Sequence, residues 1–343
     1  MSDVERQTSI DALRGLAVLL MIMVHAAATW TPSDTSQLTL LASMVSGLGG
    51  LAAPLFVVLF GWGLMQRKRP WQERLRQASF LFMCQAVVNI SAPHLFQPLT
   101  PGVLSLMGVM VLCEPQWTAF LRRSRSPFIS FTFVMLVMLS FVWYAKPLQG
   151  PSNWSARIET STLYDVGMHT LLTGTYPFVP WVLFGAFGAT LALQPGRRPV
   201  AIGLATGMAV SVVILVHAII NETAWALPTG EASLTFFPAN GPFLIAALTG
   251  VCLMWLVVER RPWLHALAAS GRCSLSLYVA HFVPLFWLHT MDEQGGWGLN
   301  AAMVATVTYT AAWMLLGTFW WKRWPRWTLE SAWRRWSRPG ISS

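Results

Sequence analysis

The sequence predicts an all-α polytopic membrane protein, and three observations lead to that fold class. Of the 343 residues, 55% are hydrophobic and only 11% are charged, whereas soluble domains carry about 25% charged residues. The mean hydropathy is +0.51. Apolar stretches near the roughly 20 residues that a spanning helix needs recur along the whole chain. Because the chain shows no internal repeat or low-complexity linker, we expect one transmembrane domain over residues 1–321 and a cytoplasmic tail over residues 322–343.

Ten apolar stretches of the chain are candidates for spanning helices. The third and fourth are short for a span, and the fourth has Pro101 near its start and Glu114 at its end. The sixth contains Pro177 and Pro180, which leave backbone groups that a cavity or a neighbouring helix must satisfy. The ten stretches are residues 10–30, 41–65, 76–92, 99–113, 128–145, 176–194, 199–220, 240–258, 270–289 and 299–321.

The basic residues fall almost entirely on one side of this arrangement. An even number of spans puts 21 of the 23 lysines and arginines on the side of both termini and leaves only Lys146 and Arg157 on the other. Positive charge that flanks spans marks the cytoplasmic side. We therefore expect about ten transmembrane helices with both termini in the cytoplasm. Topology explains the formal charge of +9, so membrane lipids are expected partners and nucleic acid is not.

The first stretch, Ser9 to Trp30, carries ionisable side chains inside an apolar run. Asp11 precedes Arg14 by three residues and His25 follows Arg14 by eleven, so a helix places all three on nearly one face, with about 16 Å between Arg14 and His25. An ionisable group inside a membrane is a functional-site hypothesis by default. The alternative is that Arg14 only anchors the helix and His25 only packs. The preceding residues are more acidic than basic, which favours an uncleaved span over a signal peptide.

The second stretch ends in glycines and leads into the densest internal basic cluster. Gly61 and Gly63 either let two helices approach closely or contact a ligand. The basic cluster suits phosphates of a cytoplasmic cofactor or anionic lipid headgroups, and the alternative is that it only sets the topology. Its members are Arg67, Lys68, Arg69, Arg74 and Arg76.

The longest outer loop, residues 146–175, mixes aromatic, acidic and basic side chains. Loops of that length in a compact protein are often functional, and this mixture suits a sugar or another polar acceptor. The alternative is a plain surface loop. The residues that form the possible acceptor site are Arg157, Glu159, Asp165 and His169.

The ninth stretch carries a polar stripe. Ser274, Tyr278 and His281 stand at i, i+4 and i+7, on one face of a helix. We expect this face to form a supporting wall near the first span, away from lipid. The alternative is a hydrogen-bond ladder between helices that has no chemistry. The tail that follows the last stretch is basic and rich in tryptophan, which is typical of an interfacial helix.

No metal site is expected from the sequence. The four cysteines lie in or beside apolar segments and have no CxxC spacing. Neither a phosphate-cradling glycine motif nor a GxSxG motif competes with the features above. The cysteines are Cys84, Cys113, Cys252 and Cys273.

Four segments of the chain, in this order, resemble two related families of membrane acyltransferases. DALRGLA, with ten residues between Arg14 and His25, is similar to the opening of the acyltransferase family 3 proteins. PLFVVLFGWG, YPFVPWVLFGAFG and SLSLYVAH resemble later segments of that family or of the bacterial relatives of heparan-α-glucosaminide N-acetyltransferase. The four segments are residues 9–30, 52–65, 175–188 and 271–284, less than a quarter of the chain.

The resemblance implies a transmembrane acyltransferase in a bacterial inner membrane. His25 would be the catalytic residue. Arg14, supported by Asp11, would contact an acyl-CoA donor such as acetyl-CoA, and the acceptor would be a hydroxyl or amine of an extracytoplasmic glycan. One departure concerns the heparan-α-glucosaminide enzyme, which has asparagine at the position of His25 and its proposed catalytic histidine in the loop after the first span. This chain has no histidine in that loop, so His25 matches acyltransferase family 3 better.

The chemistry of these residue types agrees with acyl transfer. Arg14 offers a planar, always charged fork to phosphate, and a neutral imidazole deeper in the span can take a proton from an acceptor hydroxyl or amine. The main alternative is a transporter or flippase with a buried Arg/His relay, although the chain shows no inverted repeat of the kind that many transporters have. A membrane scaffold or sensor without chemistry is a third reading.

Overall fold

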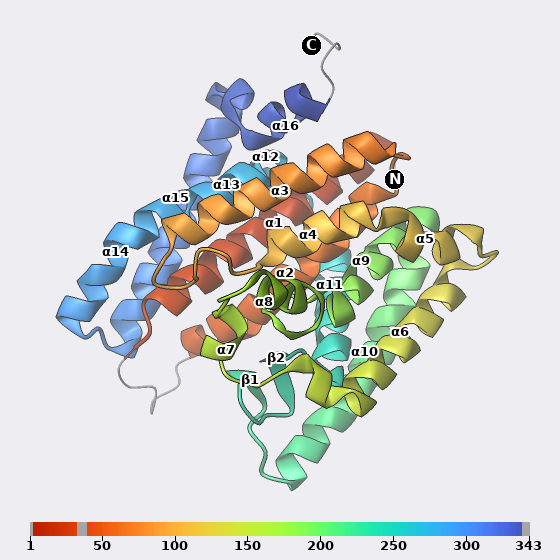
Figure 1. Ribbon diagram of the computed structural model, residues 1–343, viewed down its shortest axis with the longest axis horizontal. Coiled ribbons are helices and arrows are strands. Elements are labelled where there is room, and N and C mark those ends of the chain that lie inside the picture. The colour runs from red at the N-terminus through yellow and green to blue at the C-terminus, as the bar shows by residue number, and fades with distance from the viewer. Residues whose placement is uncertain (1–2, 33–39, 338–343) are drawn as a thin grey trace. The chain divides into compact units, whose positions relative to one another are not determined.

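The computed structural model describes residues 3–32 and 40–337, and nearly all of their regular structure is helical (Figure 1). The chain packs as two compact units that interleave along the sequence. The first consists of Met1–Phe56, Ala86–Pro98 and Val257–Ser343, and the second of Val57–Gln85 and Leu99–Leu256. Residues 338–343 of the expected tail lie outside the described residues.

The first unit is built around α1 (Asp3–Thr29), which packs against α12 (Ala268–Arg272) and α15 (Leu299–Arg323) although these helices lie far apart in the sequence. Ala12, Leu13 and Ala17 of α1 have no exposed surface. The unit also contains most of α2 (Leu40–Leu64) and the end of α3 (Trp71–Ser91). Its remaining elements are η3 (Pro262–Leu267), α13 (Ser274–Ala280), α14 (Phe282–Gly295), η4 (Pro325–Trp327) and α16 (Leu329–Ser337).

Two glycines allow the close packing of α1. A Cβ atom at Gly15 would overlap the carbonyl oxygen of Leu267, and one at Gly271 would overlap the carbonyl oxygen of Asp11. Small residues of this kind let helix backbones approach closely inside a membrane, where van der Waals contact drives association.

The second unit is formed by the end of α2, the start of α3 and the long middle part of the chain. The two strands are short and pair in parallel, with Ala226 opposite Leu234. Its elements are α4 (Val103–Leu112), α5 (Glu114–Arg123), α6 (Pro127–Tyr144), η1 (Lys146–Gln149), α7 (Ser155–Ile158), α8 (Leu163–Met168), η2 (His169–Thr173), α9 (Phe178–Leu193), α10 (Arg197–Ile220), β1 (Ala226–Thr229), β2 (Leu234–Phe237) and most of α11 (Gly241–Arg260).

Glycine also decides the packing of α2 on α9 in the second unit. A Cβ atom at Gly61 would overlap the backbone of Gly185, and one at Gly188 would overlap the carbonyl oxygen of Val58. Of the two interpretations of the glycines in the second stretch, the structure therefore gives Gly61 a helix-packing role.

The all-α membrane fold is confirmed, but the number of unbroken spans is smaller than ten. Within the described residues, six helices are long and apolar enough to cross a membrane, or up to eight spans if each of two bent pairs counts as one. Exposed apolar side chains on these helices, such as Ile129 on α6 and Val213 on α10, suit contact with lipid. The six are residues 7–29, 40–64, 127–144, 197–220, 241–260 and 299–323.

The other four expected spans are charged or broken. α3 has Glu73 in its first turn and two arginines close behind it. The fourth stretch ends after ten residues as α4, which bends by 66° into α5, and the sixth follows a bend of 50° ahead of Phe178. The ninth is divided into α12, α13 and α14. Hydropathy measures how apolar a segment is, and it does not reveal where the helix breaks.

Candidate functional site

Two buried histidines from distant parts of the sequence meet in the first unit. His25 lies on α1, and His281 lies at the break between α13 and α14. Nδ1 of His25 is 2.9 Å from Nε2 of His281. His25 is 8% exposed and His281 has no exposed surface. The ninth stretch therefore lies against the first span at this contact, as the sequence predicts.

Hydrogen bonding determines which ring nitrogen carries each proton. Nδ1 of His281 lies 3.1 Å from the carbonyl oxygen of Leu277, which only accepts, so this nitrogen must be the donor. Nε2 of neutral His281 is then an acceptor, and Nδ1 of His25 donates to it. Nε2 of neutral His25 is consequently left with its lone pair. A histidine held in this tautomer is prepared to accept a proton.

Aromatic rings surround the histidine pair. The ring of Tyr278 lies edge-on to His25 with 5.9 Å between centroids, and the ring of Phe282 lies at 4.5 Å. The hydroxyl of Tyr309 donates to the carbonyl oxygen of His281. Ser274, the third member of the predicted stripe, is half-buried at the first residue of α13. The break after Ala280 thus leaves Tyr278 and His281 together against α1.

A second histidine pair lies one helical turn further along α1. The hydroxyl of Thr29 donates to the carbonyl oxygen of His25 at 2.9 Å, and its oxygen lies 3.2 Å from Nε2 of His94. The ring of His94 is stacked on that of His289, with 4.5 Å between centroids. Burial, and next the neighbouring His289, lower the pKa of His94 to about 4. The sequence gives no sign of this pair, because its members come from a loop and from the middle of α14.

An acidic residue joins two arginines near the start of α1. Asp11 pairs with Arg14 at 3.2 Å and with Arg272 at 3.0 Å. The side chain of Arg14 is 35% exposed. Asp11 and Arg14 share one face of α1, as the spacing predicts. Two guanidinium groups around one carboxylate leave a net positive charge, which suits an anionic ligand.

The outer-loop residues lie in the second unit, and several of them hold the loop together. Arg157 is fully buried and donates to the carbonyl oxygens of Gln149, Thr173 and Gly174 at 2.9 to 3.0 Å. Burial lowers the pKa of Arg157 to about 10. The guanidinium therefore satisfies backbone acceptors where the chain turns into α9.

The other three residues of this loop differ in their exposure. The ring of His169 lies 2.7 Å from the hydroxyl of Thr173 and 2.8 Å from the carbonyl oxygen of Glu159. Asp165 and Thr162 form a capping box at the start of α8, and hydrogen bonds from Thr162 lower the pKa of Asp165. Asp165 is half-buried and Glu159 is exposed, so a ligand can reach these two of the four loop residues.

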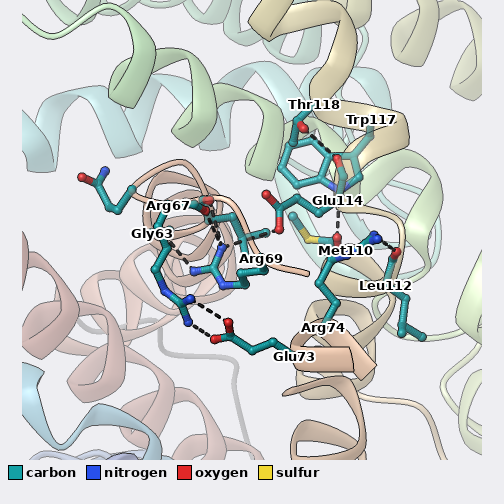
Figure 2. Close-up of polar contacts among 12 residues, drawn as sticks. Gly63, Arg67, Arg69, Glu73, Arg74, Met110, Leu112, Glu114, Trp117 and Thr118 are labelled. Atoms are coloured by element: carbon teal, nitrogen blue, oxygen red, sulfur yellow. Dashed lines mark hydrogen bonds and ion pairs between the residues drawn. The ribbon is translucent and has the colours of Figure 1, made fainter. Parts of the chain in front are cut away.

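The basic cluster after α2 is largely occupied by internal contacts, as Figure 2 shows. Arg67 donates to Glu73 at 2.7 Å, and Arg74 donates to the carbonyl oxygen of Leu112 at 2.8 Å. Arg69 and Arg122 flank the carboxylate of Glu114, at 3.5 and 3.3 Å. Lys68 and Arg76 are exposed. The cluster thus connects α2, α3 and α5 within the second unit, and only part of its charge faces solvent.

In the described part of the chain, no group of three or more His, Cys, Asp or Glu side chains is placed to hold a metal ion.

A family model described as heparan-alpha-glucosaminide N-acetyltransferase, catalytic, matches residues 6–216, more than half of the chain. The chain belongs to this family. A second model, for a protein family of unknown function (DUF418), matches residues 189–339. No curated protein matches the sequence. As a heparan-α-glucosaminide N-acetyltransferase family member, the protein is an integral membrane acetyltransferase. His25 lies in the first matched region and His281 in the second, so the histidine pair draws on both.

Proposed function

We propose that the protein transfers an acetyl or other acyl group from acyl-CoA to a hydroxyl or amine of an extracytoplasmic acceptor such as a glycan, with His25 as general base. The observation that carries the proposal is the hydrogen bond from Nδ1 of His25 to Nε2 of His281. It orients the imidazole and leaves Nε2 of His25 basic, which is what a general base requires.

The proposed reaction is a direct transfer. The acceptor oxygen or nitrogen attacks the thioester carbonyl while Nε2 of His25 removes its proton. The bond between the carbonyl carbon and sulfur then breaks, and His25 returns the proton to the departing sulfur of coenzyme A. His281 supports the imidazolium that forms in between, because its Nε2 accepts from the charged ring. Atoms and charge balance, and no cofactor is consumed.

The donor is proposed to bind at the basic end of α1. Arg14 and Arg272 flank Asp11 there, and the phosphates of coenzyme A are suitable partners for guanidinium groups. Eleven residues of helix separate Arg14 from His25, about 16 Å along the axis. A thioester at the end of the pantetheine arm can extend across that distance while its phosphates stay at the basic end.

The orientation follows from the charge distribution. Both termini and the basic end of α1 are proposed to face the cytoplasm of a bacterial inner membrane, because the ten crossings expected from the sequence, four of them through charged or broken helices, would put 21 of 23 basic residues on that side. We propose residues 1–321 as the transmembrane acyltransferase domain and residues 322–343 as a cytoplasmic tail. A reporter that is active only outside the cytoplasm should be silent when fused after Ser343, and its activity would overturn this orientation.

The loop of residues 146–175 in the second unit is proposed to bind the acceptor. Glu159 and Asp165 offer reachable carboxylates that can accept hydrogen bonds from sugar hydroxyls. Arg157 and His169 would support this function by holding the loop backbone in place.

Radiolabelled acetyl-CoA and the purified protein in liposomes test the proposed function. Transfer of label to an added glycan or amine acceptor, lost in His25→Asn, is the expected result. Conversely, acceptor movement across the bilayer without acetylation would overturn the enzyme proposal in favour of a transporter or flippase. If the protein binds acetyl-CoA but neither acetylates the acceptor nor moves it, the role of His25 as the base for these acceptors is contradicted.

A further inference from the structure

A cavity of about 350 Å³ lies in the first unit, between α13, α15 and the tail. Most of its wall is apolar, and one arginine stands at the edge. This volume is within the range of small-molecule sites, about 300–1,000 Å³. The residues that matter here are Ser276, Val279, Ala280, Trp320, Trp327 and Arg335.

The cavity is on the reverse side of the helix that carries the histidine site. Each residue turns a helix by about 100°, so Ser276 and Ala280 stand nearly opposite Tyr278 on α13. Tyr278 contacts His25, whereas Ser276 and Ala280 line the cavity. Whatever fills the cavity therefore touches α13 without entering the candidate active site.

Polar contacts fix the tail at one end of the cavity. Glu330 of α16 accepts a hydrogen bond from the backbone of Leu275 at 2.6 Å and from the hydroxyl of Ser276 at 2.7 Å. The same hydroxyl accepts from the backbone of Leu329 at 2.7 Å. The carboxylate thus satisfies N–H groups at the start of α13. The tail is docked by these contacts, and the space beside them is lined by apolar side chains.

The rim of the cavity carries positive charge and tryptophan. Arg335 is exposed and donates to the carbonyl oxygen of Arg326 at 3.4 Å, and among residues 3–32 and 40–337 it has no carboxylate partner. Trp327 is 80% exposed. A basic segment with exposed tryptophans is the composition that lies at a membrane surface and attracts anionic headgroups.

We propose that this cavity binds an acyl chain of an anionic phospholipid, whose phosphate pairs with Arg335. The apolar wall takes the chain, the exposed tryptophans lie among the headgroups, and the guanidinium selects the negative charge. A nucleotide is a poor fit, because the wall offers few hydrogen-bonding groups. The bound lipid bridges the tail and the reverse face of α13. This site is independent of the chemistry assigned to His25.

Lipid binding to the detergent-purified full chain, measured by native mass spectrometry, tests the site. The probes are phosphatidylglycerol and phosphatidylcholine with identical acyl chains, so that only the headgroup charge differs. The wild-type protein should bind phosphatidylglycerol more tightly. Arg335→Gln should weaken phosphatidylglycerol about fivefold, which corresponds to about 1 kcal/mol, and leave phosphatidylcholine unchanged. Ala280→Leu, which narrows the cavity, should weaken both lipids.

The matched control is Arg334→Gln. Arg334 is the neighbouring exposed arginine of the same helix, and it does not line the cavity. Equal loss of phosphatidylglycerol in Arg334→Gln and Arg335→Gln would overturn the site, since it would show an effect of total charge alone. A free fatty acid that binds as tightly as phosphatidylglycerol would also overturn it. If Ala280→Leu does not fold, Trp327→Ala at the exposed rim takes its place and should weaken both lipids.

Discussion

The ring nitrogens of His25 and His281 lie 2.9 Å apart, although the two residues are separated by 256 positions in the sequence. The carbonyl oxygen of Leu277 accepts from Nδ1 of His281. Nε2 of His281 is therefore the acceptor, and Nδ1 of His25 the donor, in the hydrogen bond between the two rings. The basic nitrogen is then Nε2 of His25. We therefore expect His25 to act as the base and His281 to hold it in position.

His25→Asn should lower the acetyl-transfer rate by about 10²–10⁴-fold. Asparagine retains a hydrogen-bonding side chain of similar reach and cannot act as a base near neutral pH. Acetyl-CoA affinity and the melting temperature should stay close to wild type. A fully active His25→Asn protein would mean that the base is elsewhere, with His169 in the outer loop as the next histidine to test.

His281→Leu should lower the rate by about 10²-fold, because an imidazole that loses its orienting partner is displaced from its productive position. As a positioning residue, His281 should also affect the pH profile, which should shift in His281→Leu as the tautomer of His25 is no longer fixed. His281→Gln can accept from Nδ1 of His25 through its amide oxygen and should recover part of the loss. Equal rates and unchanged pH profiles in both variants would contradict the role.

Arg14→Lys should raise the KM for acetyl-CoA about tenfold, equivalent to about 1.4 kcal/mol, with little change in kcat. Lysine keeps the charge and loses the planar fork that grips phosphate. Lys68→Gln, which removes an exposed cation of the other unit, is the control and should leave the KM unchanged. If Arg14→Ala binds donor as well as wild type, Arg14 serves only as a topology anchor.

Glu114→Gln should lower the free energy of unfolding by about 3 kcal/mol, since removal of one partner leaves a buried charge uncompensated. The side chains of Arg69 and Glu114 are 9% and 6% exposed, and burial lowers the pKa of Arg69 while Glu114 opposes that shift. Glu73→Gln is the comparison. It breaks a pair whose arginine is 36% exposed and should cost no more than about 1 kcal/mol. Equal effects in denaturant melts would contradict this difference.

The protein should lose stability on acidification through His94. The pKa of His94 is lowered to about 4, against about 6.5 in an unfolded chain. The unfolded state therefore binds the proton more readily. The stabilising contribution of neutral His94 is complete above about pH 6.5 and is lost as the pH falls towards 4. Melting curves at several pH values should show a smaller acid effect in His94→Gln than in wild type, and parallel curves would argue against His94.

The sequence predicted those parts of the site that depend on one helix. The spacing of Asp11, Arg14 and His25 decides which side chains share a face, and the structure shows Asp11 paired with Arg14. The resemblance of short segments to membrane acyltransferases likewise predicted the family to which the chain belongs. The pairing of His94 with His289 could not be predicted, because it depends on how a loop and the middle of α14 come together.

The breaks in the helices could not be predicted either. The bend of 66° between α4 and α5 follows an apolar segment that looks like an ordinary span. Arg157 appeared to be an outer-loop ligand, since a charged residue in a loop is normally exposed. It is buried instead because the carbonyl groups of the turn before α9 need donors. Such requirements appear only once the backbone path is known.

Gly271 packs so closely against the carbonyl oxygen of Asp11 that a side chain at this position has no room. The residue after Gly271 is Arg272, which pairs with the side chain of the same Asp11. The close approach of the two backbones therefore brings Arg14 and Arg272 to the same carboxylate. A larger residue at position 271 would push the two backbones apart and separate Arg272 from Asp11, so an uncharged glycine helps to decide where the positive charge at this end of α1 lies.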